Sequence, residues 1–302
     1  MNITLTGATG FIGARLTRRL LETGHSVHAL ARKRPAGLPD AVRFSEWRST
    51  DCEPPSESLA GADAVIHLAG EPVAQRWTPD AKKRIRASRV DGTRHLVNAL
   101  STESRRPQVL ISASAIGIYG SRGDEILTET SVPAGDFLAQ VVIDWEKAAG
   151  LAESLGIRVV CLRFGVVLGA DGGALAKMLP PFRLGMGGRL GSGKQWTSWI
   201  HVDDVINLML FALSNPAVRG AVNATAPTPV TNAEFTKELA AVIHRPAIFP
   251  VPTLALKLLF GEMASVVLAS QRVIPGVAKK AGFEFEYPQL GPALRGLLAK
   301  GD

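Results

Sequence analysis

The sequence predicts an α/β fold in which a doubly wound parallel sheet carries a smaller C-terminal substrate lobe. Three observations support this prediction. Short β-like runs alternate with helical periods through the first half of the chain, a glycine-rich turn joins the first strand to the first helix, and this rhythm breaks after about residue 169. The 302 residues are 46% hydrophobic and 20% charged, which is typical of a globular protein and excludes disordered and collagen-like chains.

Hydrophobic periodicity and helix signals place the individual elements. Apolar runs predict strands at Ile3–Thr6, Val27–Ala31, Ala64–Leu68, Val109–Ser112 and Val159–Phe164. Helices are expected between them, at Phe11–Thr23, from Pro79 to about Leu100, and from about Phe137 to Leu155. Gly24 closes the first helix, and Thr78 is the expected N-cap of the second, with Pro79 in its first turn.

The first turn carries the strongest functional signal. It reads Gly7-Ala8-Thr9-Gly10-Phe11-Ile12-Gly13, between a strand and a helix. Gly7 permits the tight turn, Gly10 lets the backbone approach a pyrophosphate, and Gly13 lets the helix pack closely on the strand, while helix N–H groups face the anion. A dinucleotide site is favoured over a simple glycine-rich βα turn.

The end of the second strand indicates which dinucleotide binds. A site for NAD usually has an acidic residue about 20 positions after the glycines, which holds the ribose 2′-OH. Here the sequence reads Arg32-Lys33-Arg34, with no acid before Asp40. Cations at this place can pair with a 2′-phosphate, so NADP(H) is the predicted cofactor, and a solvated basic turn is the alternative.

Domain boundaries follow from the change of pattern. Residues 1–168, with 200–226 returning to them, are expected to form an NADP-binding Rossmann domain, and residues 169–199 and 227–302 the smaller lobe. The glycine-rich segment within 169–199 holds Arg183, Arg189, Lys194 and Trp196. These residues are predicted to bind a small anionic substrate, and a flexible linker between the lobes is an equal alternative.

Further motifs resemble an extended short-chain dehydrogenase/reductase. They are Asp63-Ala64-Val65-Ile66-His67-Leu68-Ala69-Gly70, Ile111-Ser112-Ala113-Ser114 with Ile118-Tyr119-Gly120, and Trp199-Ile200-His201-Val202-Asp203-Asp204. Other strings are similar to an atypical branch, the epimerase-family proteins (NAD-dependent epimerase/dehydratase-like) with a C-terminal domain of unknown function. These strings include Gly70-Glu71-Pro72, Leu162-Arg163-Phe164-Gly165-Val166 and Ser270-Gln271-Arg272-Val273-Ile274-Pro275.

The resemblance implies an NADP(H)-binding Rossmann domain and a small C-terminal lobe. Residues expected to contact the cofactor are Gly7, Thr9, Gly10, Phe11, Ile12, Gly13, Arg32, Lys33, Leu68, Ala69, Gly70, Glu71, Ser112, Arg163, Gly165 and Val166.

The catalytic Tyr-x-x-x-Lys pair of the wider superfamily is absent. Four residues after Tyr119 and Tyr287, the two tyrosines of the chain, stand Gly123 and Gly291. Any acid or base must therefore come from elsewhere at the carboxyl ends of the strands, where Ser114, Tyr119 and Glu71 are the candidates. Each also has an ordinary structural interpretation, as a turn former, a packed ring and a helix-lead carboxylate.

Partners and location are predicted from charge and cysteines. The net charge of +7 favours anionic partners. The basic residues Lys82, Lys83, Arg84, Arg86 and Arg89 are interpreted as a solvated helix face and not as a nucleic-acid site. The two cysteines are far apart, and the sequence shows no metal-ligand cluster, signal peptide or long apolar span. These features predict a cytoplasmic protein without a metal or a membrane partner, and a homodimer is one expected assembly.

The sequence thus predicts an NADP(H)-dependent oxidoreductase or epimerase-like enzyme acting on a small anionic substrate. The missing tyrosine–lysine pair keeps a second hypothesis open, in which the chain is a catalytically weak NADP(H)-sensing regulatory protein.

Overall fold

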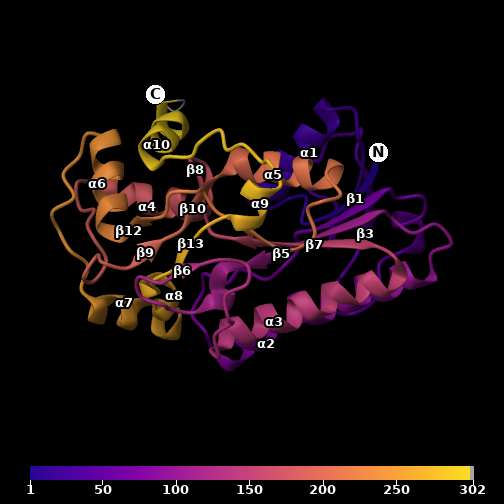
Figure 1. Cartoon of the computed structure of the whole chain (residues 1–302), viewed down its shortest axis with the longest axis horizontal. Helices are drawn as coiled ribbons and strands as arrows, with labels where there is room; N and C mark the ends of the chain where they lie inside the picture. The colour runs from indigo at the N-terminus through magenta and orange to yellow at the C-terminus, as the bar shows by residue number, and fades with distance from the viewer. Residues whose placement is uncertain (300–302) are drawn as a thin grey trace.

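The computed structural model describes residues 1–299 and contains a central sheet of seven parallel strands (Figure 1). The strand order is β11-β7-β5-β4-β1-β2-β3, so the order reverses between β1 and β4. This reversal confirms the predicted doubly wound fold, in which ligands bind at the carboxyl ends of the strands beside the reversal. The strands span Asn2–Thr6 (β1), Ser26–Ala31 (β2), Arg43–Glu46 (β3), Ala64–His67 (β4), Val109–Ala115 (β5), Arg158–Phe164 (β7) and Gly220–Ala224 (β11).

Helices cover both faces of this sheet. On one face lie α1 (Phe11–Glu22) and α5 (Val202–Ser214), and on the other lie the long helices α2 (Pro79–Thr102) and α3 (Phe137–Gly150) (Figure 1). Each helix buries an apolar stripe against the strands, because strand residues alternate between the two faces. One core joins Ile3 and Leu5 to α1 and α5, and a second joins Val65 and Leu110 to α2.

The predicted helix starts are correct in detail. The Thr78 side chain accepts a hydrogen bond from the Ala81 N–H at 3.2 Å, and Pro79 opens α2. The Asp136 side chain accepts from the Ala139 N–H at 3.0 Å and caps α3. These caps satisfy N–H groups that have no partner within the helix. The third predicted helix ends at Gly150 and continues as a 3-10 turn, η3 (Leu151–Leu155).

The second lobe has a core of its own, in which Trp199, Phe235 and Leu294 are buried together. Helix α4 (Gly173–Arg183) occupies part of the expected glycine- and proline-rich loop and runs through Pro180 and Pro181. Burial of its apolar face in this core outweighs the loss of backbone hydrogen bonds at the prolines. The other elements of the lobe are β8 (Val166–Gly169), β9 (Trp196–Thr197), β10 (Trp199–His201), β12 (Val230–Thr231), α6 (Asn232–Val242) and α10 (Leu290–Leu298).

Short elements connect the two lobes. Strand β6 pairs in parallel with β13, so a segment after the fifth sheet strand meets the C-terminal region. The remaining short elements of the described residues are η1 (Ser56–Ser58), η2 (Ile116–Tyr119), β6 (Ile126–Leu127), α7 (Thr253–Phe260), η4 (Gly261–Met263), α8 (Ala264–Leu268), β13 (Arg272–Val273) and α9 (Gly276–Lys280).

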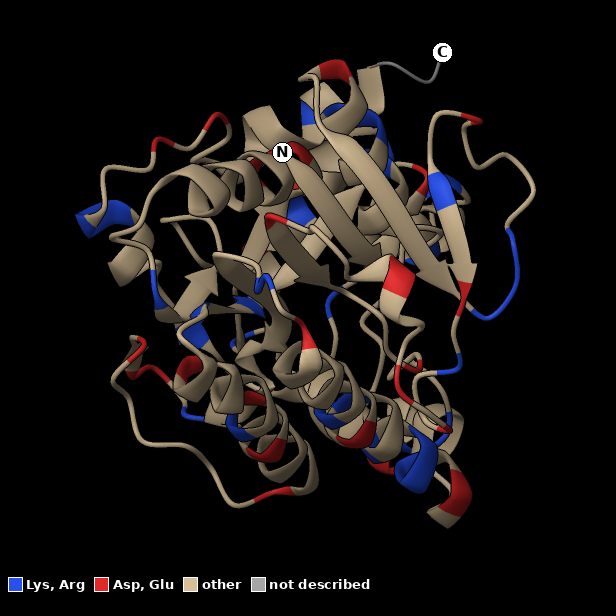
Figure 2. Ribbon diagram, turned by 90° about the vertical axis from the view of Figure 1, so that its right-hand side faces the viewer, with Lys and Arg blue, Asp and Glu red and all other residues tan. Residues whose placement is uncertain are grey.

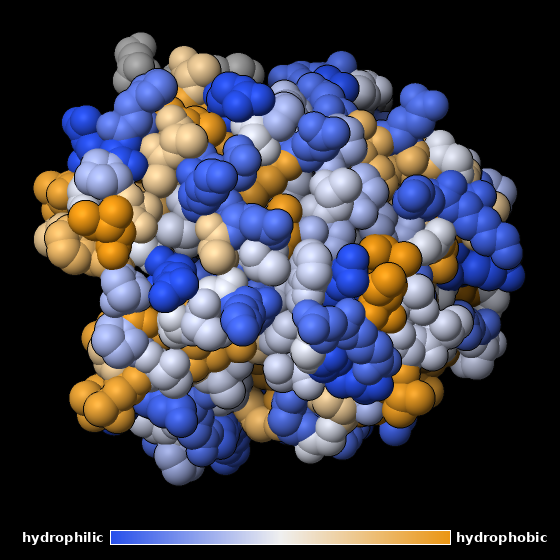
Figure 3. Space-filling view, turned by 60° about the vertical axis from the view of Figure 1, so that its left-hand side comes forward, coloured by the Kyte–Doolittle hydropathy of each residue, from blue (hydrophilic) through white to orange (hydrophobic). Residues whose placement is uncertain are grey.

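The surface is mixed in charge and in hydropathy. The two long helices carry both signs of charge (Figure 2), and on the face that carries the C-terminal lobe apolar side chains lie in separate patches among hydrophilic ones (Figure 3). Lys83, Arg84 and Arg86 of α2 are exposed. Residues 1–299 include no helix with the length and apolarity that crossing a membrane requires.

Candidate functional site

The glycine-rich turn forms a backbone cradle at the start of α1. Gly7 has a φ of 74°, and a Cβ placed on it would lie 2.9 Å from the carbonyl carbon of Leu68. A Cβ on Gly13 would lie 2.0 Å from the Gly7 carbonyl oxygen. Gly10 is the N-cap and has no side chain to cover the N–H groups of the first helical turn. This arrangement fits the diphosphate of a dinucleotide, as the sequence predicts.

A cavity of about 930 Å³ opens from this turn along the carboxyl ends of the strands. Many of the residues expected at the cofactor line it. They are Gly7, Gly10, Phe11, Ile12, Gly13, Leu68, Ala69, Gly70, Gly165 and Val166, joined by the candidate catalytic Ser114. Thr9 is exposed beside the turn, and Ser112 is buried with its hydroxyl donating to the Ala113 carbonyl at 3.1 Å, so neither lines the wall.

Arg32 and Lys33 follow the end of β2 and are exposed. Because β2 pairs with β1, with Leu30 opposite Thr6, they leave the sheet beside the strand that leads into the glycine turn. They do not line the cavity itself. Their position is the one at which a ribose 2′ substituent of a dinucleotide is read in this fold.

Arg89 is not part of a solvated helix face, contrary to the interpretation of its sequence. It lines the cavity, and a Cβ placed on Gly70 would lie 3.3 Å from its Cζ. Its guanidinium donates to the carbonyl oxygens of Glu71 at 2.9 Å and Ile85 at 3.2 Å and lies 5.2 Å from the centroid of the Trp145 ring. Burial lowers the pKa of Arg89 to about 10, which leaves it a cation at neutral pH.

A signal for Arg89 is present in the sequence of α2. Position 89 falls on the same helix stripe as the buried residues Ile85, Thr93 and Leu96. A cation on the stripe that faces the protein needs an internal partner or a ligand. The neighbouring basic residues obscured this position.

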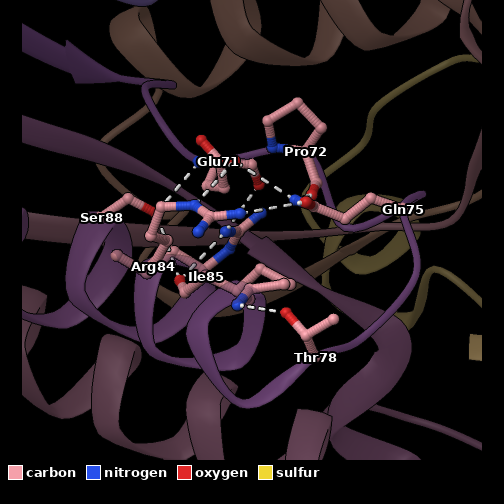
Figure 4. Close-up of polar contacts among 9 residues, drawn as sticks. Glu71, Pro72, Gln75, Thr78, Arg84, Ile85 and Ser88 are labelled. Carbon is pink, nitrogen blue, oxygen red and sulfur yellow. Dashed lines mark hydrogen bonds and ion pairs between the residues drawn. The ribbon is translucent and has the colours of Figure 1, made fainter. Parts of the chain in front are cut away.

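Glu71 makes structural contacts within the loop after β4 and with α2 (Figure 4). Its N–H donates to the Ser88 hydroxyl at 2.9 Å, and its carboxylate accepts from Gln75 Nε2 at 3.2 Å and lies 3.6 Å from Arg84 Nε. The carboxylate does not line the cavity. Glu71 contributes to the site through its carbonyl, which positions the Arg89 guanidinium.

Ser114 lies at the carboxyl end of β5 and donates a hydrogen bond to Glu146 Oε1 at 2.5 Å. Glu146 comes from α3 and also accepts from Arg163 through both oxygens, at 2.8 and 2.7 Å. Burial alone would lower the pKa of Arg163, but the hydrogen bonds and charge of Glu146 raise it. The cavity hydroxyl is therefore backed by a carboxylate that a buried cation holds in place.

Tyr119 lies behind this pair and outside the cavity. Its hydroxyl donates to Asn223 Oδ1 at 2.7 Å and accepts from Arg163 Nη1 at 2.8 Å, and the side chain is completely buried. Burial raises the pKa of Tyr119, which disfavours a phenolate. Neither Tyr119 nor Arg163 lines the cavity, so this geometry gives no support to a catalytic tyrosine or to a cofactor contact from Arg163.

Helix α3 turns an entirely apolar face toward the cavity. The residues on this face are Phe137, Leu138, Val141, Val142 and Trp145. Pairs four residues apart on it, such as Leu138 with Val142, contain neither tyrosine nor lysine. The wall at which a tyrosine–lysine pair would act therefore has no titratable group.

The residues expected to bind an anionic substrate lie away from this cavity. Arg183, Arg189, Lys194 and Trp196 are all absent from its wall. Arg189 lines a separate hollow with Lys237 and Arg245 in the C-terminal lobe. Trp196 donates from Nε1 to Asp124 Oδ1 at 2.7 Å and packs against the Arg272 guanidinium, 4.2 Å from its ring centroid. Among residues 1–299, no cluster of three or more His, Cys, Asp or Glu side chains is arranged to hold a metal ion.

Known proteins resemble this chain over its full length. The Arabidopsis thaliana "Epimerase family protein SDR39U1 homolog, chloroplastic" is 44% identical over 310 residues, covering 99% of this chain and 87% of that protein. "Epimerase family protein YfhF" of Bacillus subtilis is 40% identical over 300 residues, covering 99% and 98%. The crystal structure of human epimerase family protein SDR39U1 (isoform 2) with NADPH superposes with a TM-score of 0.89 at 33% identity and covers 100% of both chains.

More distant structures share the fold alone. One of them is UDP-glucuronic acid 4-epimerase from Bacillus cereus in complex with NAD, with 19% identity and a TM-score of 0.78. The match covers 98% of this chain and 96% of that one. Residues 251–297 match a domain of unknown function, DUF1731. Residues 3–224, which hold all of the parallel sheet except Asn2, match the NAD dependent epimerase/dehydratase family. The chain belongs to the NAD dependent epimerase/dehydratase family.

Proposed function

We propose that this protein is an NADP(H)-dependent oxidoreductase that interconverts an alcohol and a carbonyl compound. The glycine cradle would hold the cofactor diphosphate, with the Arg89 guanidinium beside it, and Arg32 and Lys33 would pair with the 2′-phosphate. The human relative crystallised with NADPH supports this choice of cofactor. When bound, the cofactor supplies or accepts a hydride.

The hydrogen bond from Ser114 to Glu146 carries the proposal, because it provides a proton acceptor at a wall that lacks a tyrosine. In the oxidative direction the substrate hydroxyl passes its proton to Ser114 Oγ while the Ser114 proton moves to Glu146 Oε1, 2.5 Å away. In the reductive direction the same two groups return a proton to the carbonyl oxygen. Arg163 keeps the carboxylate in position for either transfer.

Cofactor choice is tested by fluorescence titration with NADPH and NADH. We expect NADPH to bind at least about tenfold more tightly, because a charge-assisted pair is worth about 1.5–3 kcal/mol. The Arg32→Ala/Lys33→Ala variant should lose this preference. The Lys279→Ala/Lys280→Ala variant removes the same charge from exposed positions on α9 and should keep it. Equal affinities for the two cofactors in the unaltered protein would refute the NADP(H) assignment.

Proton transfer is tested with Ser114→Ala on a panel of alcohols and carbonyl compounds. Turnover should fall about 100-fold or more while the NADPH dissociation constant stays unchanged. Ser112→Ala is the matched control, because Ser112 is two residues away on β5 but does not line the cavity. Full turnover in Ser114→Ala would exclude the Ser114–Glu146 pair as the proton path.

The apolar face of α3 favours the second candidate function, an NADP(H)-sensing protein with little or no turnover. The NADPH titration and the turnover measurements distinguish the enzyme from the sensor. Tight NADPH binding without hydride transfer to any compound of the panel supports the sensor. The expected anionic substrate receives no support from the cavity, since Arg183, Arg189 and Lys194 lie away from its wall.

A further inference from the structure

We propose that the cavity takes a neutral, mainly apolar substrate, an aliphatic or aromatic alcohol or carbonyl compound with few hydrogen-bonding groups. We also propose that η4 and α8 form the outer wall of this cavity. This inference rests on the proposed function, because it names the substrate class of the same site. It also gives a role to a segment within the region that matches a domain of unknown function.

The walls beyond the glycine cradle are apolar on several sides. Helix α3 contributes the five apolar side chains described above, and Ala115 and Ile116 follow from the end of β5. Val73 and Trp77 contribute from the loop before α2. A ligand gains affinity here mainly by removing apolar surface from water.

Most polar side chains on the wall are already engaged within the protein, and the exception is Trp145, whose buried Nε1 has no hydrogen-bond partner among residues 1–299. Lys82 pairs with Glu262, Gln271 Nε2 donates to the Ile116 carbonyl at 2.9 Å, and Trp77 Nε1 donates to the Val73 carbonyl at 3.0 Å. The same holds for the hydroxyls, since Ser265 donates to the Glu262 carbonyl at 2.7 Å and Ser121 accepts from the Ser270 N–H at 3.1 Å. Asp136 caps α3 and Arg89 contacts two backbone carbonyls.

This engagement disfavours sugar-like substrates. A sugar brings several hydroxyl groups that lose water on binding, and each one that finds no partner lowers affinity about tenfold. The proposed substrate needs a partner only for its reacting oxygen. Ser114, backed by Glu146, supplies that partner.

An ion pair attaches the outer wall of the cavity to α2. Val266 on α8 and Ala269 just after it line the cavity, and Glu262 on η4 forms an ion pair with Lys82 of α2. The Lys82 ammonium also lies 5.1 Å from the centroid of the Phe137 ring, at the start of α3. The ion pair thereby holds the C-terminal segment against α2, and the same lysine contacts the start of α3.

The test uses the NADPH-loaded protein and the neutral fluorescent probe N-phenyl-1-naphthylamine, whose emission rises in apolar surroundings. We expect the probe to bind and to be displaced by octanal and benzaldehyde, but not by UDP-glucose or glucose 6-phosphate. Displacement by either of these sugar compounds, with none by the aldehydes, would overturn the proposal.

Two variants place the probe in this cavity. Val266→Asp should weaken the probe at least fivefold, because a carboxylate would face the apolar space. Val132→Asp makes the same change at a side chain that is 70% exposed and away from the cavity, and should leave probe binding unchanged. Leu138→Gln, at a half-buried position on α3, should also weaken the probe. Unchanged probe affinity in both Val266→Asp and Leu138→Gln would refute the proposal.

The dissociation constant of NADPH is measured on the same variants by fluorescence titration. It should give the wild-type dissociation constant, so the inference and the proposed cofactor role fail separately. Loss of probe binding with intact NADPH binding is the expected result for Val266→Asp. Loss of NADPH binding in Val266→Asp would assign this wall to the cofactor and overturn the apolar substrate site.

Discussion

The two ends of the cavity are built from different materials. The end at the glycine turn offers backbone N–H groups and one part-buried guanidinium, whereas the end at α3 and α8 is lined mainly by apolar side chains. The first end is suited to an anionic ligand of fixed shape, and the second to a ligand held by contact area. From this difference we infer that cofactor binding depends on backbone geometry and that substrate choice depends on side-chain packing.

The cofactor end is rigid because the strands on either side of the order reversal are tied together there. Thr6 Oγ1 at the end of β1 accepts from the N–H groups of Leu68 and Ala69, each at 3.1 Å. It also lies 2.7 Å from Nδ1 of His67, at the end of β4. Substitutions here should affect folding and cofactor binding together, whereas substitutions at the other end should affect only the substrate.

Gly13→Ala should produce the largest effect. Its Cβ would lie 2.0 Å from the Gly7 carbonyl oxygen, and backbone must move to accommodate it. We expect a loss of at least about 3 kcal/mol in the free energy of unfolding or a fall of about 100-fold in NADPH affinity, measured by urea denaturation and fluorescence titration.

Gly150→Ala is the matched control for this substitution. Gly150 ends α3 and an added Cβ there meets nothing within 4 Å, so NADPH affinity should stay at the wild-type value. Normal stability and NADPH affinity in Gly13→Ala would show that the cradle tolerates displacement and would remove the contrast between the two ends.

His67 should make stability depend on pH. Burial lowers the pKa of His67 to about 4, against 6.5 in the unfolded chain. The unfolded state therefore binds a proton that the folded state does not bind between these values. The contribution of neutral His67 to the free energy of unfolding is present above pH 6.5. It is lost as the pH falls to about 4, for a total of about 3 kcal/mol.

The measurement compares urea denaturation of the wild type and His67→Gln between pH 7 and pH 4. His67→Gln should be less sensitive to acid over this interval, although it loses the ring that contacts Thr6. An equally steep fall of stability in both proteins would assign the acid sensitivity to other groups, including the buried His28, whose pKa burial also lowers.

Local patterns were sufficient to predict the inner strands and the capped helices. The strands at the edges of the sheet were harder to predict from the sequence. β3 and β11 lie at its two edges, and their sequences, Arg43–Glu46 and Gly220–Ala224, lack a continuous apolar run because edge strands are less enclosed. Helix α4 was concealed by Pro180 and Pro181, since its stability comes from packing in the second lobe.

The candidate site divides in the same way. The roles of Gly7 and Gly13 are local, since each depends on the backbone of its own turn and the adjoining strand end, and the sequence predicted them. The surroundings of Tyr119 and Arg163 are not local. Arg163 on β7 stands opposite Ser114 on β5, and Asn223 reaches Tyr119 from β11, so their network exists only once the sheet is assembled. Arg89 was missed for a related reason, because its burial depends on the loop after β4 and on Trp145 of α3.

The smallest effect is expected from Arg189→Ala/Lys194→Ala, in the segment that the sequence assigned to an anionic substrate. Both side chains are exposed or border a different hollow, and neither reaches the cavity at either end. The double variant should therefore keep NADPH affinity and probe affinity within about twofold of the wild type, as expected for surface substitutions. Fluorescence titration with each ligand measures this directly. A large loss of NADPH affinity would mean that this segment closes over the cofactor end in solution, and a loss confined to the probe would extend the substrate end beyond α8. Either result would move the boundary between the cofactor end and the substrate end of the cavity, which lies at Ser114 and the α3 wall in this structure.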